Sequence, residues 1–120
     1  MNDIVVGIDR SETAAVALDK AASLASALRA NLHIVTCVDR SAPVDMHVGS
    51  DHFHVDRLGD AAQFLEGAAR RVGAADASTV AVGLGDPAAF LCEEADRLRA
   101  RLIVVGNQRV QSVARVLGAV

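Results

Sequence analysis

The chain has 120 residues, of which 52% are apolar and 2% aromatic, and its formal net charge is −3 at pH 7. This length allows one domain with one hydrophobic core. The twelve basic residues are scattered, so the chain lacks the basic patch typical of a nucleic-acid binder. No apolar run approaches the roughly 18 residues that cross a bilayer.

The first elements follow a strand–helix–strand pattern. Residues 3–9 are rich in β-branched side chains and predict a strand, and Ser11 can cap a helix that continues to about residue 30. We expect this helix to bury a broad apolar face: Val16, Leu18, Ala21, Leu24, Ala25 and Leu28. Residues 32–38 form a nearly continuous apolar run, which predicts a strand covered on both faces.

Residues 39–56 break the pattern. They contain Pro43, Gly49, four aspartates and three histidines, so we expect a mobile loop without regular structure. The acidic and histidine side chains could gather around zinc or nickel, although a solvated segment is the preferred interpretation; they are Asp45, His47, Asp51, His52, His54 and Asp56. His33 is expected to be a strand residue, and we predict no metal site.

The rest of the chain continues the alternation. A helix is expected over residues 57–72, with Gly73 ending it and an apolar face formed by Leu58, Ala61, Ala62, Leu65 and Ala69. Residues 78–82 predict a strand. Asp86 and Pro87 favour a helix start, with that helix ending near residue 99. Residues 101–105 predict the fourth strand.

This alternation predicts an α/β fold of three layers, Rossmann-like or flavodoxin-like, with an open, doubly wound parallel sheet. Right-handed crossovers favour the strand order 3-2-1-4, which places the first and fourth strands side by side. Asp9 and Gly106 would then face one crevice, where backbone N–H groups could bind phosphate and a carboxylate could bind ribose or adenine. Alternatively, Gly106 is a simple turn residue and Asp9 caps the helix entry.

Four blocks of sequence carry a more specific signal. They are Ile-Val-Val-Gly-Ile-Asp-Arg-Ser-Glu, Leu-His-Ile-Val-Thr-Cys-Val-Asp, Val-Gly-Leu-Gly-Asp-Pro-Ala and Leu-Ile-Val-Val-Gly-Asn. In this order they resemble the universal stress protein family, over residues 3–120. The resemblance implies a doubly wound sheet, a homodimer, and membership of one of two groups, which either hold ATP or have lost the phosphate loop.

The phosphate loop of the ATP-holding group is only partly matched. Its pattern is Gly, two residues, Gly, nine residues, Gly, then Ser or Thr. Gly106 matches the first glycine, but Arg109 replaces the second, eight residues separate Arg109 from Gly118, and Ala119 replaces the hydroxyl residue. The resemblance therefore implies a degenerate phosphate-loop region over residues 106–120.

The sequence matches the family pattern better at the adenosine end of the implied site than at the phosphate loop. Asp9 and Val38 match the adenosine-contacting positions of the family, with Val38 acting through its backbone. ATP or AMP therefore remains a candidate ligand. Family members also continue into a further helix and a fifth strand, whereas this sequence ends at Val120, so the fifth strand is expected to be missing from the domain, which spans residues 1–120. An uncovered fourth strand would be an exposed sheet edge, so we expect either that the natural chain continues past Val120 or that a second copy covers this edge in a homodimer.

Several further expectations follow. No catalytic constellation is recognisable, so we predict a protein that is not an enzyme. Cys37 and Cys92 lack metal-ligand spacing and are expected to be buried free thiols. The start of the chain has no export signal, which favours the cytoplasm. Two functions stay open: a stress-response regulator with an adenine-nucleotide site, and a ligand-free dimerisation module.

Overall fold

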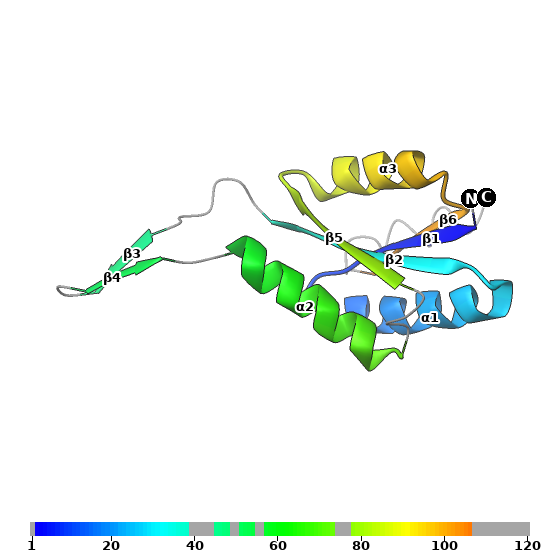
Figure 1. Cartoon of the computed structure of the whole chain (residues 1–120), viewed down its shortest axis with the longest axis horizontal. Coiled ribbons are helices and arrows are strands. Elements are labelled where there is room, and N and C mark those ends of the chain that lie inside the picture. Colours follow the sequence, from blue (N-terminus) through cyan, green and yellow to red (C-terminus); the bar gives the residue numbers. More distant parts are fainter. Residues whose placement is uncertain (1, 39–44, 49–50, 55–56, 74–77, 107–120) are drawn as a thin grey trace.

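The computed structural model describes residues 2–38, 45–48, 51–54, 57–73 and 78–106. Figure 1 shows a layer of strands with helices on both of its faces. The elements in chain order are β1 (Asp3–Gly7), α1 (Glu12–Leu28), β2 (Asn31–Val38), β3 (Asp45–Val48), β4 (Asp51–His54), α2 (Arg57–Arg71), β5 (Ser78–Leu84), α3 (Pro87–Leu98) and β6 (Leu102–Val105).

The main sheet has four parallel strands in the order β5-β2-β1-β6. With the short β3–β4 pair left out of the count, this is the predicted order 3-2-1-4, so the predicted α/β fold is confirmed. The register places Val5 of the central strand β1 between His33 of β2 and Ile103 of β6. The carboxyl ends of β1, β2 and β6 consequently lie at one edge of the sheet.

The hydrophobic core lies mainly between the sheet and the helices α1 and α2. Side chains of β1 and β2 with no more than 1% exposure form its centre: Ile4, Val6, Leu32 and Ile34. Helix α3 covers the opposite face of the sheet (Figure 1). Among the described residues, no helix is long and apolar enough to span a membrane.

The expected apolar face of α1 is partly wrong. Val16, Leu24 and Leu28 are 53%, 41% and 37% exposed, whereas the buried residues of the helix are Leu18 and four of its alanines: Ala14, Ala17, Ala21 and Ala25. Small side chains let the helix backbone approach the sheet closely, and Val16 and Leu24, each one position from a buried alanine, then point outward. Leu58 of α2 is likewise 47% exposed.

The helix starts were predicted correctly. The Ser11 hydroxyl accepts a hydrogen bond of 3.1 Å from the Ala14 N–H, and the Asp86 carboxylate accepts one of 3.2 Å from the Ala89 N–H. Each side chain thus satisfies an amide that has no partner inside its helix. Gly73 follows α2 with φ at +70°, the left-handed conformation typical of a residue that ends a helix.

Residues 39–56 contain regular structure that the sequence analysis missed. Strands β3 and β4 pair antiparallel, with Asp45 opposite His54 and Val48 opposite Asp51, in a separate two-stranded sheet (Figure 1). Polar and apolar residues alternate through β3 and over residues 52–54 of β4, and Gly49 and Ser50 stand between the two strands in the sequence. That combination is typical of a hairpin, so the expectation of a stretch without regular structure was wrong.

Candidate functional site

A cavity of about 130 Å³ opens at the carboxyl ends of β1, β2 and β6. We call it the crevice. Its walls come from these strand ends and from the first turns of α3, and include Ile8, Asp9, Thr36, Cys37, Pro87, Phe90 and Gly106. The structure therefore brings Asp9 and Gly106 into one cavity, as expected from the neighbouring positions of β1 and β6. The carboxyl edge of an open parallel sheet is the usual ligand position in such folds.

Asp9 begins the connection between β1 and α1. One carboxylate oxygen, Oδ1, accepts hydrogen bonds from the Ser11 N–H at 2.9 Å and from the Ser11 hydroxyl. The same hydroxyl accepts from Ala14, so Asp9 supports the helix cap indirectly. Among the described residues, Asp9 Oδ2 has no hydrogen-bond partner. The aspartate thus has a structural role and still presents one free acceptor beside the crevice.

Val38 lines a second, more open cavity of about 410 Å³ on the α2 side of the sheet. Asp9, Thr36 and Cys37 line both cavities. The Val38 carbonyl accepts a hydrogen bond of 2.9 Å from the Gly85 N–H, which leaves one of its two lone pairs for another donor. This second lone pair is compatible with the predicted contact between the Val38 backbone and adenosine, which stays a prediction.

Gly106 has a packing reason to be glycine. A Cβ at this position would lie 2.4 Å from the Ala17 Cβ and 2.5 Å from the Thr13 carbonyl oxygen, both in α1. The positive-φ glycines of the described residues are Gly73 and Gly85, so the conformation of Gly106 does not itself require glycine. The close approach of α1 therefore accounts for Gly106. Arg109, Gly118 and Ala119, the other predicted phosphate-loop residues, lie outside the described residues.

The two cysteines differ in their surroundings. Cys37 is partly buried, and its thiol lies 3.3 Å from the Gly85 carbonyl oxygen, to which it donates. Cys92 on α3 is exposed, so the expectation that both thiols are buried was wrong for this residue. Cys37 was not among the predicted site residues, and its place at the carboxyl end of a central strand explains why it lines the crevice.

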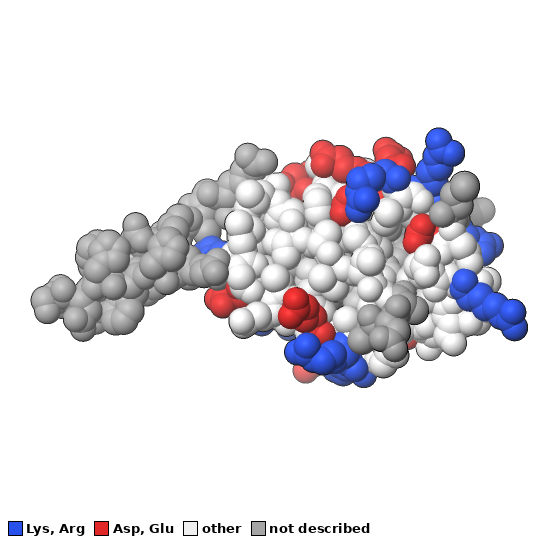
Figure 2. All heavy atoms as spheres, in the orientation of Figure 1, with Lys and Arg blue, Asp and Glu red and all other residues white. Residues whose placement is uncertain are grey.

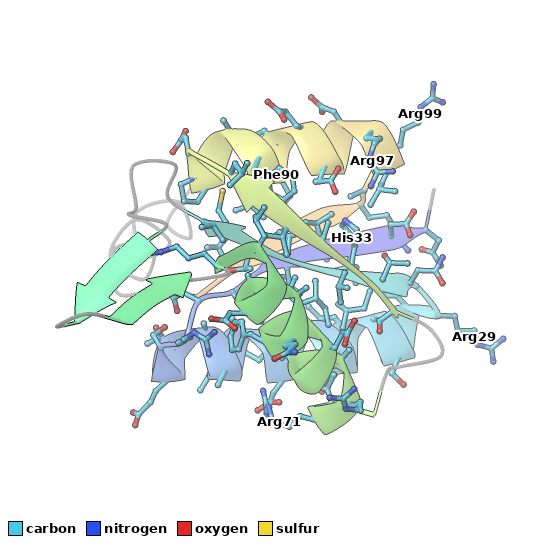
Figure 3. The ribbon with its side chains drawn as sticks, turned by 60° about the vertical axis from the view of Figure 1, so that its left-hand side comes forward. Arg29, His33, Arg71, Phe90, Arg97 and Arg99 are labelled. Carbon is cyan, nitrogen blue, oxygen red and sulfur yellow. The ribbon has the colours of Figure 1, made fainter. Side chains whose placement is uncertain are left out.

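A buried polar group connects the sheet to α3 below the crevice. His33 of β2 is 4% exposed, and its Nε2 lies 3.0 Å from Oε1 of Glu94 on α3. Because an ionised carboxylate only accepts hydrogen bonds, this nitrogen donates to it. The other ring nitrogen of His33 hydrogen-bonds the Thr79 hydroxyl of β5. His33 is a strand residue, as expected, and Figure 3 shows its side chain between the sheet and α3.

Arg97 completes this group from the next turn of α3. Its Nε donates to Glu94 Oε2 at 2.7 Å and its Nη2 donates to Oε1 at 3.2 Å. The hydrogen bonds from Arg97, followed by the contact with His33, hold the pKa of Glu94 below its usual value, although burial acts in the opposite direction. The ion pair therefore helps to fix α3, which carries Pro87 and Phe90 into the wall of the crevice.

The described residues contain no group of three or more His, Cys, Asp or Glu side chains placed to hold a metal ion. The candidate metal ligands of residues 45–56 have side chains that lie outside the described part of the structure, so the metal hypothesis for this segment stays untested. Charged side chains of both signs are interspersed on the face shown in Figure 2, around a wide uncharged area between them.

Comparison with known proteins gives a consistent result. Residues 1–120 match the sequence profile of the family described as the universal stress protein family. A crystal structure of a universal stress protein from Burkholderia pseudomallei is 26% identical, with a TM-score of 0.68, over 98% of this chain and 89% of that one. None of the curated proteins compared matches the chain.

Two further crystal structures are similar. Protein Rv1636 from Mycobacterium tuberculosis H37Rv is 27% identical, with a TM-score of 0.65, over 88% of this chain and 71% of that one. A universal stress protein in complex with cAMP is 28% identical, with a TM-score of 0.66, over 87% of this chain and 75% of that one. An adenine nucleotide is thus the ligand of one similar protein.

Proposed function

Because the chain belongs to the universal stress protein family, we propose that it is a cytoplasmic, non-enzymatic stress-response regulator that binds an adenine nucleotide in the crevice and acts as a homodimer. The observation that carries the ligand proposal is the shared cavity of Asp9 and Gly106, at the carboxyl ends of two adjacent parallel strands. The similar protein that holds cAMP supports the ligand class.

The surroundings of the crevice suit a nucleoside. Phe90, Leu91 and Pro87 offer apolar surface to a base. Asp9 Oδ2 can accept from a ribose hydroxyl, and the second lone pair of the Val38 carbonyl can accept from an adenine amino group. Ala119 removes a hydroxyl donor, and the Cβ of Arg109 would crowd a turn that the family pattern builds with glycine, so we expect AMP or cAMP to bind at least as well as ATP.

We propose binding without catalysis because of the side chains that line the crevice. Among the described residues that line the crevice, the ionisable side chains are Asp9 and Cys37, with no histidine or lysine beside them to act as a base. A nucleophile such as a thiol is commonly activated by an adjacent base within hydrogen-bond reach. The crevice therefore suits binding better than catalysis.

The position of Cys37 provides a test of nucleotide binding. In a Cys92→Ser background, the alkylation rate of Cys37 by N-ethylmaleimide is measured with and without millimolar AMP, cAMP or ATP. Occupation of the crevice should slow alkylation several-fold. The matched control is Cys37→Ser, in which the exposed Cys92 should react at one rate under all conditions. An unchanged rate for Cys37 at every nucleotide concentration would count against the proposal.

A ligand-free dimerisation module is the second candidate, and two observations favour it. The packing against α1 explains Gly106 without a ligand. In addition, Leu102 and Ile103 of the edge strand β6 are 40% and 44% exposed, which supplies apolar surface for a partner. A protein that forms dimers while nucleotide leaves Cys37 unprotected would match this second candidate.

A further inference from the structure

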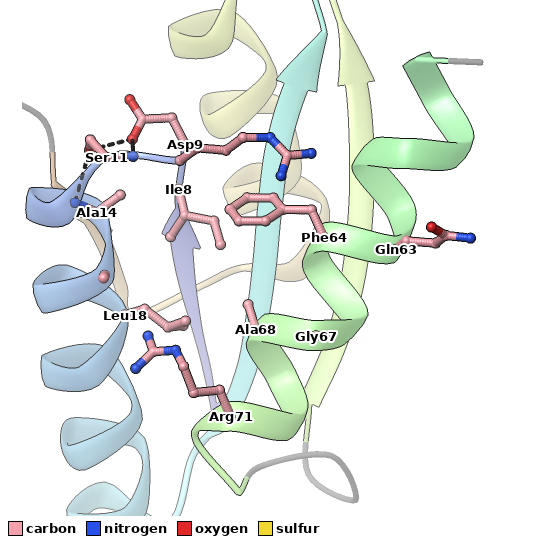
Figure 4. A pocket seen from close by; sticks show the side chains of 12 residues that line it. Ile8, Asp9, Ser11, Ala14, Leu18, Gln63, Phe64, Gly67, Ala68 and Arg71 are labelled. Atoms are coloured by element: carbon pink, nitrogen blue, oxygen red, sulfur yellow. Dashed lines mark hydrogen bonds between the residues drawn. The ribbon is translucent and has the colours of Figure 1, made fainter. Parts of the chain in front are cut away.

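A groove between α1 and α2 lies on the opposite face of the sheet from α3, and the residues it shares with the crevice are Ile8 and Asp9. The groove encloses about 360 Å³, within the roughly 300–1,000 Å³ typical of small-molecule sites. Ile8 and Leu18 form its apolar floor, and Phe64 and Gly67 of α2 form one wall (Figure 4). Arg10 lies at one end of the groove and Arg71 at the other.

Gly67 supports a functional role for the groove. It lies inside α2, where glycine weakens a helix relative to alanine. Its φ is not positive, and an added Cβ would meet no neighbouring atom within 4 Å. Neither backbone conformation nor close packing therefore requires glycine here. A side chain at this position would instead occupy the groove.

The charges at the two ends differ. At one end, Arg71 pairs with Asp19 at 3.0 Å, so its charge is already balanced. At the other end, the guanidinium carbon of Arg10 lies 4.5 Å from the centre of the Phe64 ring, and no carboxylate among the described residues pairs with it. A guanidinium over a ring keeps N–H donors at its edge, in the fork that matches a carboxylate.

From these features we propose that the α1–α2 groove binds a small organic acid, whose apolar body lies between Leu18, Phe64 and Gly67 and whose carboxylate pairs with Arg10. The nucleotide crevice does not explain the groove, because Leu18, Gly67 and Arg71 take no part in it. Arg10 and Phe64 also line the cavity that contains Val38. Leu18 and Gly67 line the groove and neither of the other two cavities, so they distinguish the groove from both.

The test uses 2-naphthoate as the probe and neutral 2-naphthalenemethanol for comparison, with binding followed by backbone amide NMR shifts. We expect naphthoate to shift Leu18, Gly67 and Ala68 and to bind about tenfold more tightly than the neutral alcohol. Absence of shifts at these residues at millimolar probe, or shifts confined to Phe90 and Leu91 in the crevice, would overturn the proposal.

Substitutions at Gly67 and Arg10 test the apolar and the charged part of the proposed site. Gly67→Met should fill the groove and weaken naphthoate binding at least tenfold, while its melting temperature stays at or above that of the parent and nucleotide protection of Cys37 is unchanged. Gly67→Ala should give a smaller loss. Arg10→Gln should weaken naphthoate binding to the level of the neutral alcohol, whereas Arg70→Gln, on the same helix as Gly67 but outside the groove, should change nothing. Parental naphthoate affinity in Gly67→Met or Arg10→Gln would contradict the proposal.

Discussion

Gly106 lies so close to α1 that a methyl group on it would come within 2.4 Å of the Ala17 Cβ. The strand end and the helix can share this space only when residue 106 has no side chain. The close contact explains why a glycine follows β6 whether or not the crevice holds a ligand. A substitution at Gly106 should therefore change the stability of the fold whether or not the crevice binds a ligand.

The first prediction concerns this contact. Gly106→Ala should lower the free energy of unfolding by about 1–3 kcal/mol, because helix α1 or the strand end must shift to admit the methyl group. Gly67→Ala is the matched control and should raise it by about 0.5–1 kcal/mol, since open space surrounds Gly67 inside a helix. Urea denaturation measures both changes. Equal stability of Gly106→Ala and the parent would contradict the packing account.

The second prediction concerns pH. The pKa of Glu94 is lowered in the folded state by Arg97 and His33, so its contribution to stability is present above its unfolded pKa and is lost as pH falls through the lower folded pKa. Glu94→Gln should therefore be less stable at pH 7 and lose less stability between about pH 5 and pH 3.

Urea denaturation across that pH range provides the measurement. Glu93→Gln is the control, because Glu93 is an exposed neighbour on the same helix and should leave the shape of the profile unchanged. Parallel stability profiles for the parent and Glu94→Gln would show that the buried pair does not link stability to pH.

The third prediction concerns assembly. If the protein dimerises through the edge strand β6, Ile103→Lys should convert the dimer to a folded monomer in sedimentation equilibrium, since Ile103 is already 44% exposed and its substitution leaves the core intact. Leu84→Lys is the control at the opposite edge, where Leu84 of β5 is 45% exposed, and should stay dimeric. A parent protein that is monomeric at high concentration would refute this mode of assembly.

The sequence predicted those parts of the fold that depend on local pattern. The β-branched runs gave all four parallel strands, and the caps at Ser11 and Asp86 marked helix starts that the structure confirms. The strand order followed from right-handed crossovers, which placed Asp9 and Gly106 in one cavity. The hairpin was predictable as well, but the polar residues around Gly49 were given more weight than the alternation.

Other features depend on packing between distant segments. Val16 and Leu24 match a helical period as well as Ala14 and Ala17 do, and only contact with the sheet decides which face is buried. The Glu94 partner of His33 lies on another element, at no fixed spacing. The open space beside Gly67 depends on how far α1 and α2 stand apart, which no local pattern contains.

Calorimetric titration with AMP tests the central claim most directly, since it measures binding in the crevice without a label. The parent should bind AMP, and Asp9→Ala should weaken binding at least tenfold because the acceptor beside the ribose is lost. Asp96→Ala, on α3 outside the crevice, should bind like the parent. Melting temperatures show whether each variant is folded. Equal AMP affinity in the parent and a folded Asp9→Ala variant, or no binding of AMP, cAMP and ATP at millimolar concentration, would contradict a nucleotide site at Asp9.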